Sequence, residues 1–159
     1  MKPLPANASL HEARAATRIL VVDDDPSVRA ALRDLLDAEG YGVHEAEDGR
    51  AAIATVGEKV PHLVLLDLNM PRKDGWATFE RLMTIHPALP VIIITARPQQ
   101  GELARSQGAA GFMEKPLKPE LLLHLIEKLL SEDAETRLMR SAVHFSPQSL
   151  AATNLNSRG

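Results

Sequence analysis

Three short runs of aliphatic residues constrain the fold of this chain more than any other feature. They occur at 19-ILVV-22, 63-LVLL-66 and 91-VIII-94, and each is continuous rather than alternating. A strand with one face in water alternates polar and apolar residues, whereas a strand of a parallel sheet is covered on both faces and is apolar throughout. The runs therefore predict the central strands of a parallel sheet. Weaker strands are expected at 42–46 and 111–113.

Segments with helical periodicity separate these runs. Residues 26–40 place apolar side chains on one helical face, begin with a proline and end with a glycine. Similar segments span 49–59, 75–86 and 119–130, and a shorter helix is expected around 102–107. The alternation of strand and helix predicts an α/β fold with a doubly wound parallel sheet and helices on both of its faces.

A length of 159 residues leaves room for one domain with a sizeable core. We expect a flexible N-terminal leader over residues 1–17 and one domain over 18–130. Residues 131–159 are expected to form a helical extension followed by a disordered tail, because the last residues are polar and lack a period.

Composition excludes several classes of function. The net charge of −3 provides no basic field, so direct binding of nucleic acid is not expected. The absence of cysteine excludes disulfides, thiolate metal sites and cysteine nucleophiles. The apolar stretches are too short or too charged to enter a bilayer, which predicts a cytoplasmic protein without membrane insertion.

Polar residues follow four of the expected strands. The first strand is followed by Asp23, Asp24 and Asp25, and the later ones by Asp67, by Thr95 and by Lys115. In an open α/β sheet, ligands bind at the carboxyl ends of the strands, so these side chains should meet at one edge. Carboxylate oxygens suit a hard cation such as Mg²⁺. With a hydroxyl and an ammonium beside them, they also suit a phosphoryl group.

Five motifs occur in order along the chain. They are 20-LVVDDDP-26, 66-LDLNMP-71, 74-DG-75, 94-ITA-96 and 108-GAAGFMEKP-116. Together they resemble the receiver domain of bacterial two-component response regulators, of the single-domain type, over about residues 18–130. The resemblance implies a flavodoxin-like, five-stranded parallel sheet of order 2-1-3-4-5 with five helices.

The resemblance assigns a role to each strand-end residue. It implies that Asp67 is the phosphoacceptor, and that Mg²⁺, or Mn²⁺ in its place, is the cofactor. The metal ligands implied are Asp24 directly, Asp23 through water, Asp67 itself and the backbone carbonyl of Asn69.

Phosphate binding and switching are assigned in the same way. The resemblance implies Thr95 as the switch hydroxyl with Ala96 beside it, and Lys115 as the phosphate-binding ammonium. Phe112 matches the aromatic switch position on the fifth strand. The peptide bond between Lys115 and Pro116 is implied to be cis.

Two further aspartates read as helix caps from their positions alone. Asp25 precedes Pro26, a favoured first residue of a helix, which predicts Asp25 as the N-cap. Asp74 precedes Gly75 at the start of another helix and is predicted to be its N-cap.

The implied function is that of a response regulator. A sensor histidine kinase or a histidine phosphotransfer protein would donate the phosphoryl group, and the chain would catalyse its own phosphorylation and dephosphorylation without being a metabolic enzyme. The switch would alter contacts with an unknown protein target, and a homodimer could form through the fourth helix, the fifth strand and the fifth helix of the fold. The stretch from Thr95 to Gly108 is about two residues shorter than usual, which shortens the fourth helix.

Three alternative functions share some of these features. An aspartyl-phosphate phosphatase of the haloacid dehalogenase type needs a second aspartate two residues after the first, where this chain has Asn69. A flavodoxin-like cofactor binder conflicts with three aspartates that would repel the flavin phosphate. A receiver fragment of a larger transcriptional regulator, whose DNA-binding output domain is absent from this chain, stays open.

Overall fold

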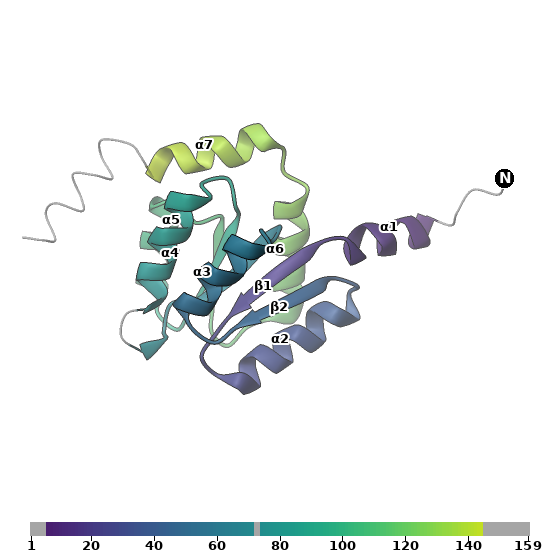
Figure 1. Cartoon of the computed structure of the whole chain (residues 1–159), viewed down its shortest axis with the longest axis horizontal. Helices are drawn as coiled ribbons and strands as arrows, with labels where there is room; N and C mark the ends of the chain where they lie inside the picture. The colour runs from purple at the N-terminus through teal and green to yellow at the C-terminus, as the bar shows by residue number, and fades with distance from the viewer. Residues whose placement is uncertain (1–5, 72–73, 145–159) are drawn as a thin grey trace, which may run out of the picture.

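A five-stranded parallel sheet forms the centre of the computed structural model, which describes residues 6–71 and 74–144. Its order, β2-β1-β3-β4-β5, is the order that the resemblance implied. Figure 1 shows the sheet between two layers of helices. The strands are β1 (Arg18–Val22), β2 (Gly42–Ala46), β3 (Leu63–Asp67), β4 (Val91–Thr95) and β5 (Gly111–Glu114).

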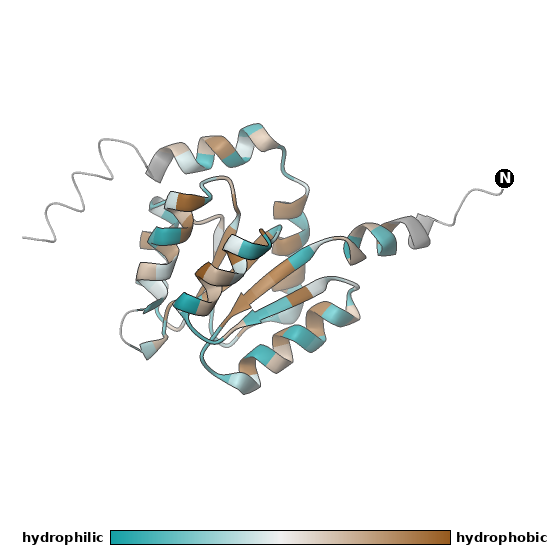
Figure 2. Ribbon diagram, viewed as in Figure 1, coloured by the Kyte–Doolittle hydropathy of each residue, from teal (hydrophilic) through white to brown (hydrophobic). Residues whose placement is uncertain are grey.

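The sheet has a hydrophobic core on each face. Along β1, Leu20 and Val22 belong to one core, and Ile19 and Val21 belong to the other. All residues of β3 and β4 are buried, which is the physical reason for their continuous apolar sequence. In Figure 2 the ribbon of β1, which lies beside β3 in the sheet, is hydrophobic over most of its length.

Five helices cover the two faces. Leucines of α2 (Pro26–Ala38) and α6 (Pro119–Leu130) enter one core. Buried residues of α3 (Gly49–Glu58), α4 (Asp74–Ile85) and α5 (Pro98–Ser106) enter the other. The right-handed crossovers of a doubly wound sheet produce this division of the helices.

The expected number of five helices was wrong, because the described residues contain seven. The first addition, α1 (Ala6–Ala15), lies within the segment expected to be a flexible leader. Its Arg14 donates hydrogen bonds of 3.2 Å to the backbone carbonyl and to the carboxylate of Glu39. The Arg14 guanidinium also lies 5.4 Å from the centre of the Tyr41 ring. The long cationic side chain of Arg14 therefore helps to attach α1 to the domain, and the His11 side chain lies beside Gly40.

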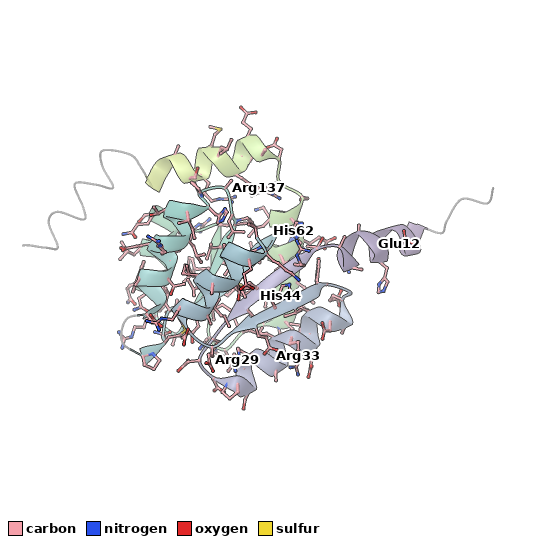
Figure 3. All side chains as sticks on the ribbon, in the orientation of Figure 1. Glu12, Arg29, Arg33, His44, His62 and Arg137 are labelled. Atoms are coloured by element: carbon pink, nitrogen blue, oxygen red, sulfur yellow. The ribbon has the colours of Figure 1, made fainter. Side chains whose placement is uncertain are left out.

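The second addition, α7 (Ala134–His144), follows α6 after a short break. The Arg137 guanidinium donates to the carbonyls of Leu129 and Leu130 at the end of α6. With the residues that precede β3 and β4, Arg137 lines a cavity of about 310 Å³. Helix α7 therefore lies at the edge where the strands begin, opposite their carboxyl ends (Figures 1 and 3). The disordered tail expected after it lies outside the described residues.

Within the described part of the chain, no helix combines the length and the apolarity that are needed to cross a bilayer.

Candidate functional site

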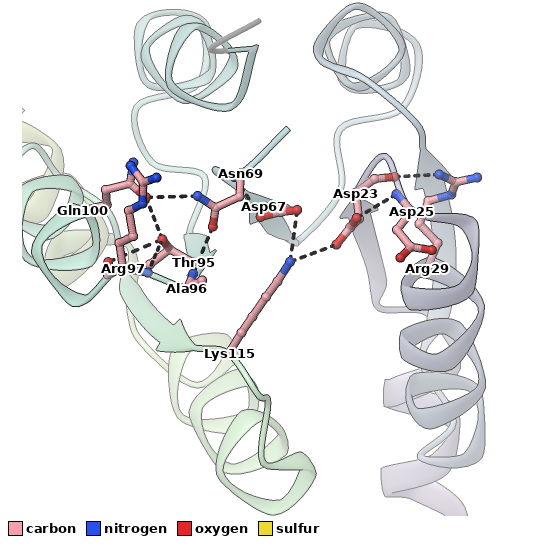
Figure 4. A network of polar contacts seen from close by, with 10 residues as sticks. All are labelled: Asp23, Asp25, Arg29, Asp67, Asn69, Thr95, Ala96, Arg97, Gln100 and Lys115. Carbon is pink, nitrogen blue, oxygen red and sulfur yellow. Dashed lines mark hydrogen bonds and ion pairs between the residues drawn. The ribbon is translucent and has the colours of Figure 1, made fainter. Parts of the chain in front are cut away.

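The carboxyl ends of β1, β3 and β5 bring three charged side chains together (Figure 4). The Nζ atom of Lys115 lies 3.2 Å from Oδ2 of Asp67 and 4.0 Å from Oδ2 of Asp23. Asp67 is 2% exposed and Asp23 is 1% exposed. Parallel strands end at a common edge, so residues far apart in sequence meet in a partly desolvated charged cluster.

An excess of negative charge marks this cluster as a candidate cation site. Asp23, Asp24 and Asp67 each offer a carboxylate oxygen, and these oxygens lie within 4.8 Å of one another. Among the residues that the structure describes, Lys115 is the one ammonium that contacts two of these three carboxylates. The Oδ2 atom of Asp23 is buried and has no hydrogen-bond partner among the described residues. Three oxygen donors and an unsatisfied buried carboxylate fit a hard divalent cation, held directly or through water.

The loop that follows Asp67 is held tightly by its own backbone and by α4. The backbone N–H of Asn69 donates to Oδ1 of Asp67 over 2.9 Å. At Gly75, in the first turn of α4, an added Cβ would lie 2.6 Å from Cα of Leu68 and 2.8 Å from the carbonyl oxygen of Asp67. Only glycine permits this approach, so α4 packs directly on the backbone of the loop that carries Asp67.

The sequence predicted Asp74 as the N-cap of α4, but in the structure the helix already includes this residue. It is the first residue of α4, and its carboxylate accepts a hydrogen bond of 3.1 Å from the backbone N–H of Gly49, at the start of α3. Asp74 thus links the starts of two neighbouring helices. A contact between residues 25 positions apart has no signature in the local sequence.

The other two aspartates after β1 differ in their contacts. Asp25 is the N-cap of α2, and its carboxylate accepts from the backbone N–H of Ser27 over 2.8 Å. The backbone N–H of Asp25 in turn donates to Oδ1 of Asp23 over 2.9 Å. Arg29, which sequence reasoning did not select, donates to the carbonyl of Asp23 over 2.6 Å. Asp24 is exposed at the rim.

Thr95, at the end of β4, is fully buried. Its hydroxyl donates to Oε1 of Gln100 in α5 over 2.7 Å. The side chain of Asn69 joins the same group, because it accepts from the backbone N–H of Ala96 and donates to Gln100. Sequence reasoning missed Gln100, since a contact five residues after Thr95 depends on the path of the intervening loop.

Phe112 and Pro116 complete the set of predicted site residues. The Phe112 side chain is half-buried and packs beside Gly101 of α5. The peptide bond between Lys115 and Pro116 is cis. The structure therefore places the predicted residues in two adjoining groups, one around Asp67 and one around Thr95.

Burial raises the pKa of Asp23 from its ordinary value of 3.8 to about 6. The hydrogen bond from the Asp25 N–H opposes this shift, as does the positive charge of Lys115. The negative charges of Asp67 and Asp24 add to it. A metal-free site at neutral pH therefore holds a carboxylate whose charge is disfavoured by its surroundings.

We expect the contribution of Asp23 to the stability of the metal-free domain to fall as the pH rises from about 4 to about 6. The pKa of Asp23 is higher in the folded chain than in the unfolded chain, so the folded chain holds the extra proton in this window. That stabilisation is fully present below the unfolded pKa and disappears as the pH passes the folded pKa. Asp23→Asn should flatten the dependence and raise the free energy of unfolding at neutral pH by on the order of 2 kcal/mol.

Chemical denaturation with a chelator, at several pH values, measures this effect. Asp37→Asn, which changes an exposed aspartate on α2, is the matched control and should behave as the wild type does. An Asp23→Asn variant with the pH dependence of the wild type would contradict the expectation.

Comparison with known proteins gives the same family that the motifs suggest. Residues 19–127 match the response regulator receiver domain. The response regulator MprA of Mycolicibacterium vanbaalenii is 40% identical over 115 residues, which cover 71% of this chain and 50% of MprA. The transcriptional regulatory protein ZraR of Salmonella typhimurium is 40% identical over 125 residues, which cover 77% of this chain and 28% of ZraR. The chain thus spans half or less of these relatives.

Solved structures agree with the sequence comparison. The response regulator protein TrrA from Thermotoga maritima, solved in complex with Mg²⁺ and beryllofluoride, is 31% identical with a TM-score of 0.65. The similarity covers 71% of this chain and 98% of the TrrA chain. By its matched residues, its sheet order and its relatives, this chain belongs to the response regulator receiver domain family.

Proposed function

We propose that the chain accepts a phosphoryl group on Asp67, in a reaction that requires Mg²⁺, from a phosphohistidine of a sensor histidine kinase or a histidine phosphotransfer protein. The observation that carries the proposal is the buried Asp67 carboxylate, with Lys115 at 3.2 Å and two further aspartates beside it. TrrA, with Mg²⁺ and beryllofluoride bound, offers a related example of such a site.

The chemistry is a transfer between two nucleophiles. A carboxylate oxygen of Asp67 forms a bond to phosphorus, the bond from phosphorus to the histidine nitrogen breaks, and the imidazole leaves with the electron pair. A carboxylate and a phosphoryl group repel each other, so the site must supply positive charge. Bound Mg²⁺, held by Asp23, Asp24, Asp67 and the Asn69 carbonyl, would neutralise charge on both reactants. Lys115, which follows the carboxyl end of β5, supplies the second positive charge.

Phosphorylation would shift the equilibrium between two conformations of the surface near Thr95 and Phe112. It replaces the single negative charge of the Asp67 carboxylate with a phosphoryl group of charge about −1.5 to −2, toward which Thr95 and Lys115 would move. Phe112 would then follow the space that Thr95 leaves. The output is a change in protein contacts, and a homodimer through α5, β5 and α6 is one form of it. Leu103 on α5 and Leu121 on α6 are 46% and 54% exposed on these elements.

Incubation with a small phosphodonor and Mg²⁺ tests the proposal directly. The intact mass should increase by one phosphoryl group, and a chelator should prevent the increase. Reduction with borohydride converts an aspartyl phosphate to homoserine, so peptide mapping should find that residue at position 67. An unchanged mass, or a phosphoryl group mapped elsewhere, would refute the proposal.

The lengths of the relatives favour a second arrangement, in which this sequence acts as the receiver part of a larger transcriptional regulator. ZraR is named as such a regulator, and the matched region is 28% of its length. In that arrangement the same switch at Asp67 would control a DNA-binding part that this chain does not contain. Both arrangements place the chain in the cytoplasm, where a kinase domain can reach it.

A further inference from the structure

We propose that Gln100 is a positioning residue that holds the Thr95 hydroxyl in the resting state and competes with the phosphoryl group for its proton. The proposal rests on the proposed function of Asp67 and adds a residue that the family resemblance did not assign. Figure 4 shows the group, in which Asn69, Thr95 and Gln100 come from three different segments.

The backbone N–H of Ala96 determines which atom donates and which accepts in the hydrogen bonds of this group. The N–H of Ala96 can only donate, so the Asn69 atom that lies 2.9 Å from it must be the carbonyl oxygen Oδ1. The amide nitrogen of Asn69 then faces Gln100 at 3.2 Å and can only donate. Gln100 must therefore present its oxygen to this point.

The same oxygen of Gln100 fixes the state of Thr95. Its Oε1 lies 2.7 Å from the Thr95 hydroxyl and carries no proton, so the hydroxyl must donate to it. The backbone N–H of Arg97 donates to the Thr95 oxygen over 3.0 Å. The Arg97 carbonyl, at 3.4 Å, is a longer and weaker alternative acceptor.

A threonine hydroxyl has one proton. A phosphoryl oxygen on Asp67 is an acceptor only, so Thr95 can bind it only by donating that proton. Donation to Gln100 and donation to the phosphoryl group exclude each other. Gln100 therefore stabilises the resting state relative to the phosphorylated state by one hydrogen bond to a buried side chain.

The residue after Gln100 connects the same turn of α5 to the second switch side chain. A Cβ added to Gly101 would lie 2.3 Å from Cδ2 of Phe112, so the ring packs against the bare backbone of the helix. Consecutive residues of α5 thus contact Thr95 through a hydrogen bond and Phe112 through its ring. Release of Gln100 frees the turn against which Phe112 is packed.

The expected consequence is a change in the affinity for a phosphoryl mimic. Gln100→Met keeps the length and the helix propensity of the side chain but removes the acceptor oxygen. The variant should bind beryllofluoride, at saturating Mg²⁺, roughly three- to tenfold more tightly than the wild type, which is the range that one net hydrogen bond predicts. Gln100→Glu keeps an acceptor oxygen and adds negative charge, so it should bind no more tightly than the wild type.

Half-saturation by beryllofluoride, followed in amide NMR spectra, is the measurement. Gln99→Ala, at an exposed neighbour on the same helix, is the matched control and should not differ from the wild type. The effect of Gln100→Met should also disappear in a Thr95→Ala background, because the competition is for the Thr95 proton. Thermal unfolding of each variant verifies that it is folded.

The outcomes separate the two proposals. Failure of the folded wild type to bind beryllofluoride would overturn the function proposed for Asp67 and the role of Gln100 with it. Binding by the wild type, with Gln100→Met unchanged or with its gain retained in the Thr95→Ala background, would overturn the role of Gln100 alone. Tighter binding by Gln100→Met that depends on Thr95 supports it.

Discussion

Asp67→Asn is expected to abolish phosphorylation by a small phosphodonor, with a loss of rate of at least about a thousandfold. The amide has nearly the shape of the carboxylate, but its oxygen carries no charge and is a far weaker nucleophile toward phosphorus. Lys115 keeps its other partner, Asp23, so the rest of the site stays paired. Time courses of intact mass, at fixed Mg²⁺ and donor concentrations, measure the loss.

Asp48→Asn is the matched control for that variant. Asp48 is the N-cap of α3, its carboxylate accepts from the Ala51 N–H, and an asparagine oxygen can accept in its place. The control undergoes the same chemical change outside the acidic cluster and should be phosphorylated at the wild-type rate. A phosphoryl group still gained by Asp67→Asn would show that the acceptor is another residue.

The second large effect is expected on the Mg²⁺ requirement, and it should differ between substitutions of the neighbouring residues Asp24 and Asp25. Asp24→Ala removes one of the three carboxylates of the cation site, so the Mg²⁺ concentration for half-maximal phosphorylation should increase roughly ten- to hundredfold. Asp25→Ser should leave that concentration unchanged, because serine can also cap α2 by accepting from the Ser27 N–H.

Phosphorylation rates at a series of Mg²⁺ concentrations measure both variants. Each variant needs a rate at saturating Mg²⁺, which separates weaker metal binding from a loss of transfer itself. Equal Mg²⁺ requirements in Asp24→Ala and Asp25→Ser would contradict the division of the acidic run into metal ligands and a cap.

Much of the fold and of the site could be predicted, because in a parallel sheet a short run of residues shows both where a strand lies and where it ends. A strand buried on both faces must be apolar along its length, so β3 and β4 are visible as continuous runs. The ends of such strands share an edge, so Asp67 and Lys115 could be placed together although 48 residues separate them. The prediction required the order of the strands but not the packing of any side chain.

The remaining features depend on contacts that have no local pattern. Helix α1 is attached through Arg14, which contacts Glu39. An arginine in an alanine-rich segment could equally well be hydrated at the surface, so the sequence does not indicate this contact. Asp74 serves the helix beside its own because α3 and α4 start close together. Gln100 reaches Thr95 only through the conformation of the loop between them. Each case is decided by tertiary geometry, which residue types alone do not encode.

Because of the contact at Gly75, the loop that carries Asp67 is held more rigidly on the α4 side than on the α5 side. On the α4 side, backbone lies against backbone with no room for a single methyl group, so that side cannot yield without separating the helix from its core. On the α5 side, a side-chain hydrogen bond between Asn69 and Gln100 links this loop to the helix, and such a bond can be exchanged for another at small cost. We expect a phosphoryl group on Asp67 to displace the α5 side of this loop more than the α4 side. In the proposed switch, the direction of the displacement is thus set by a residue that has no side chain.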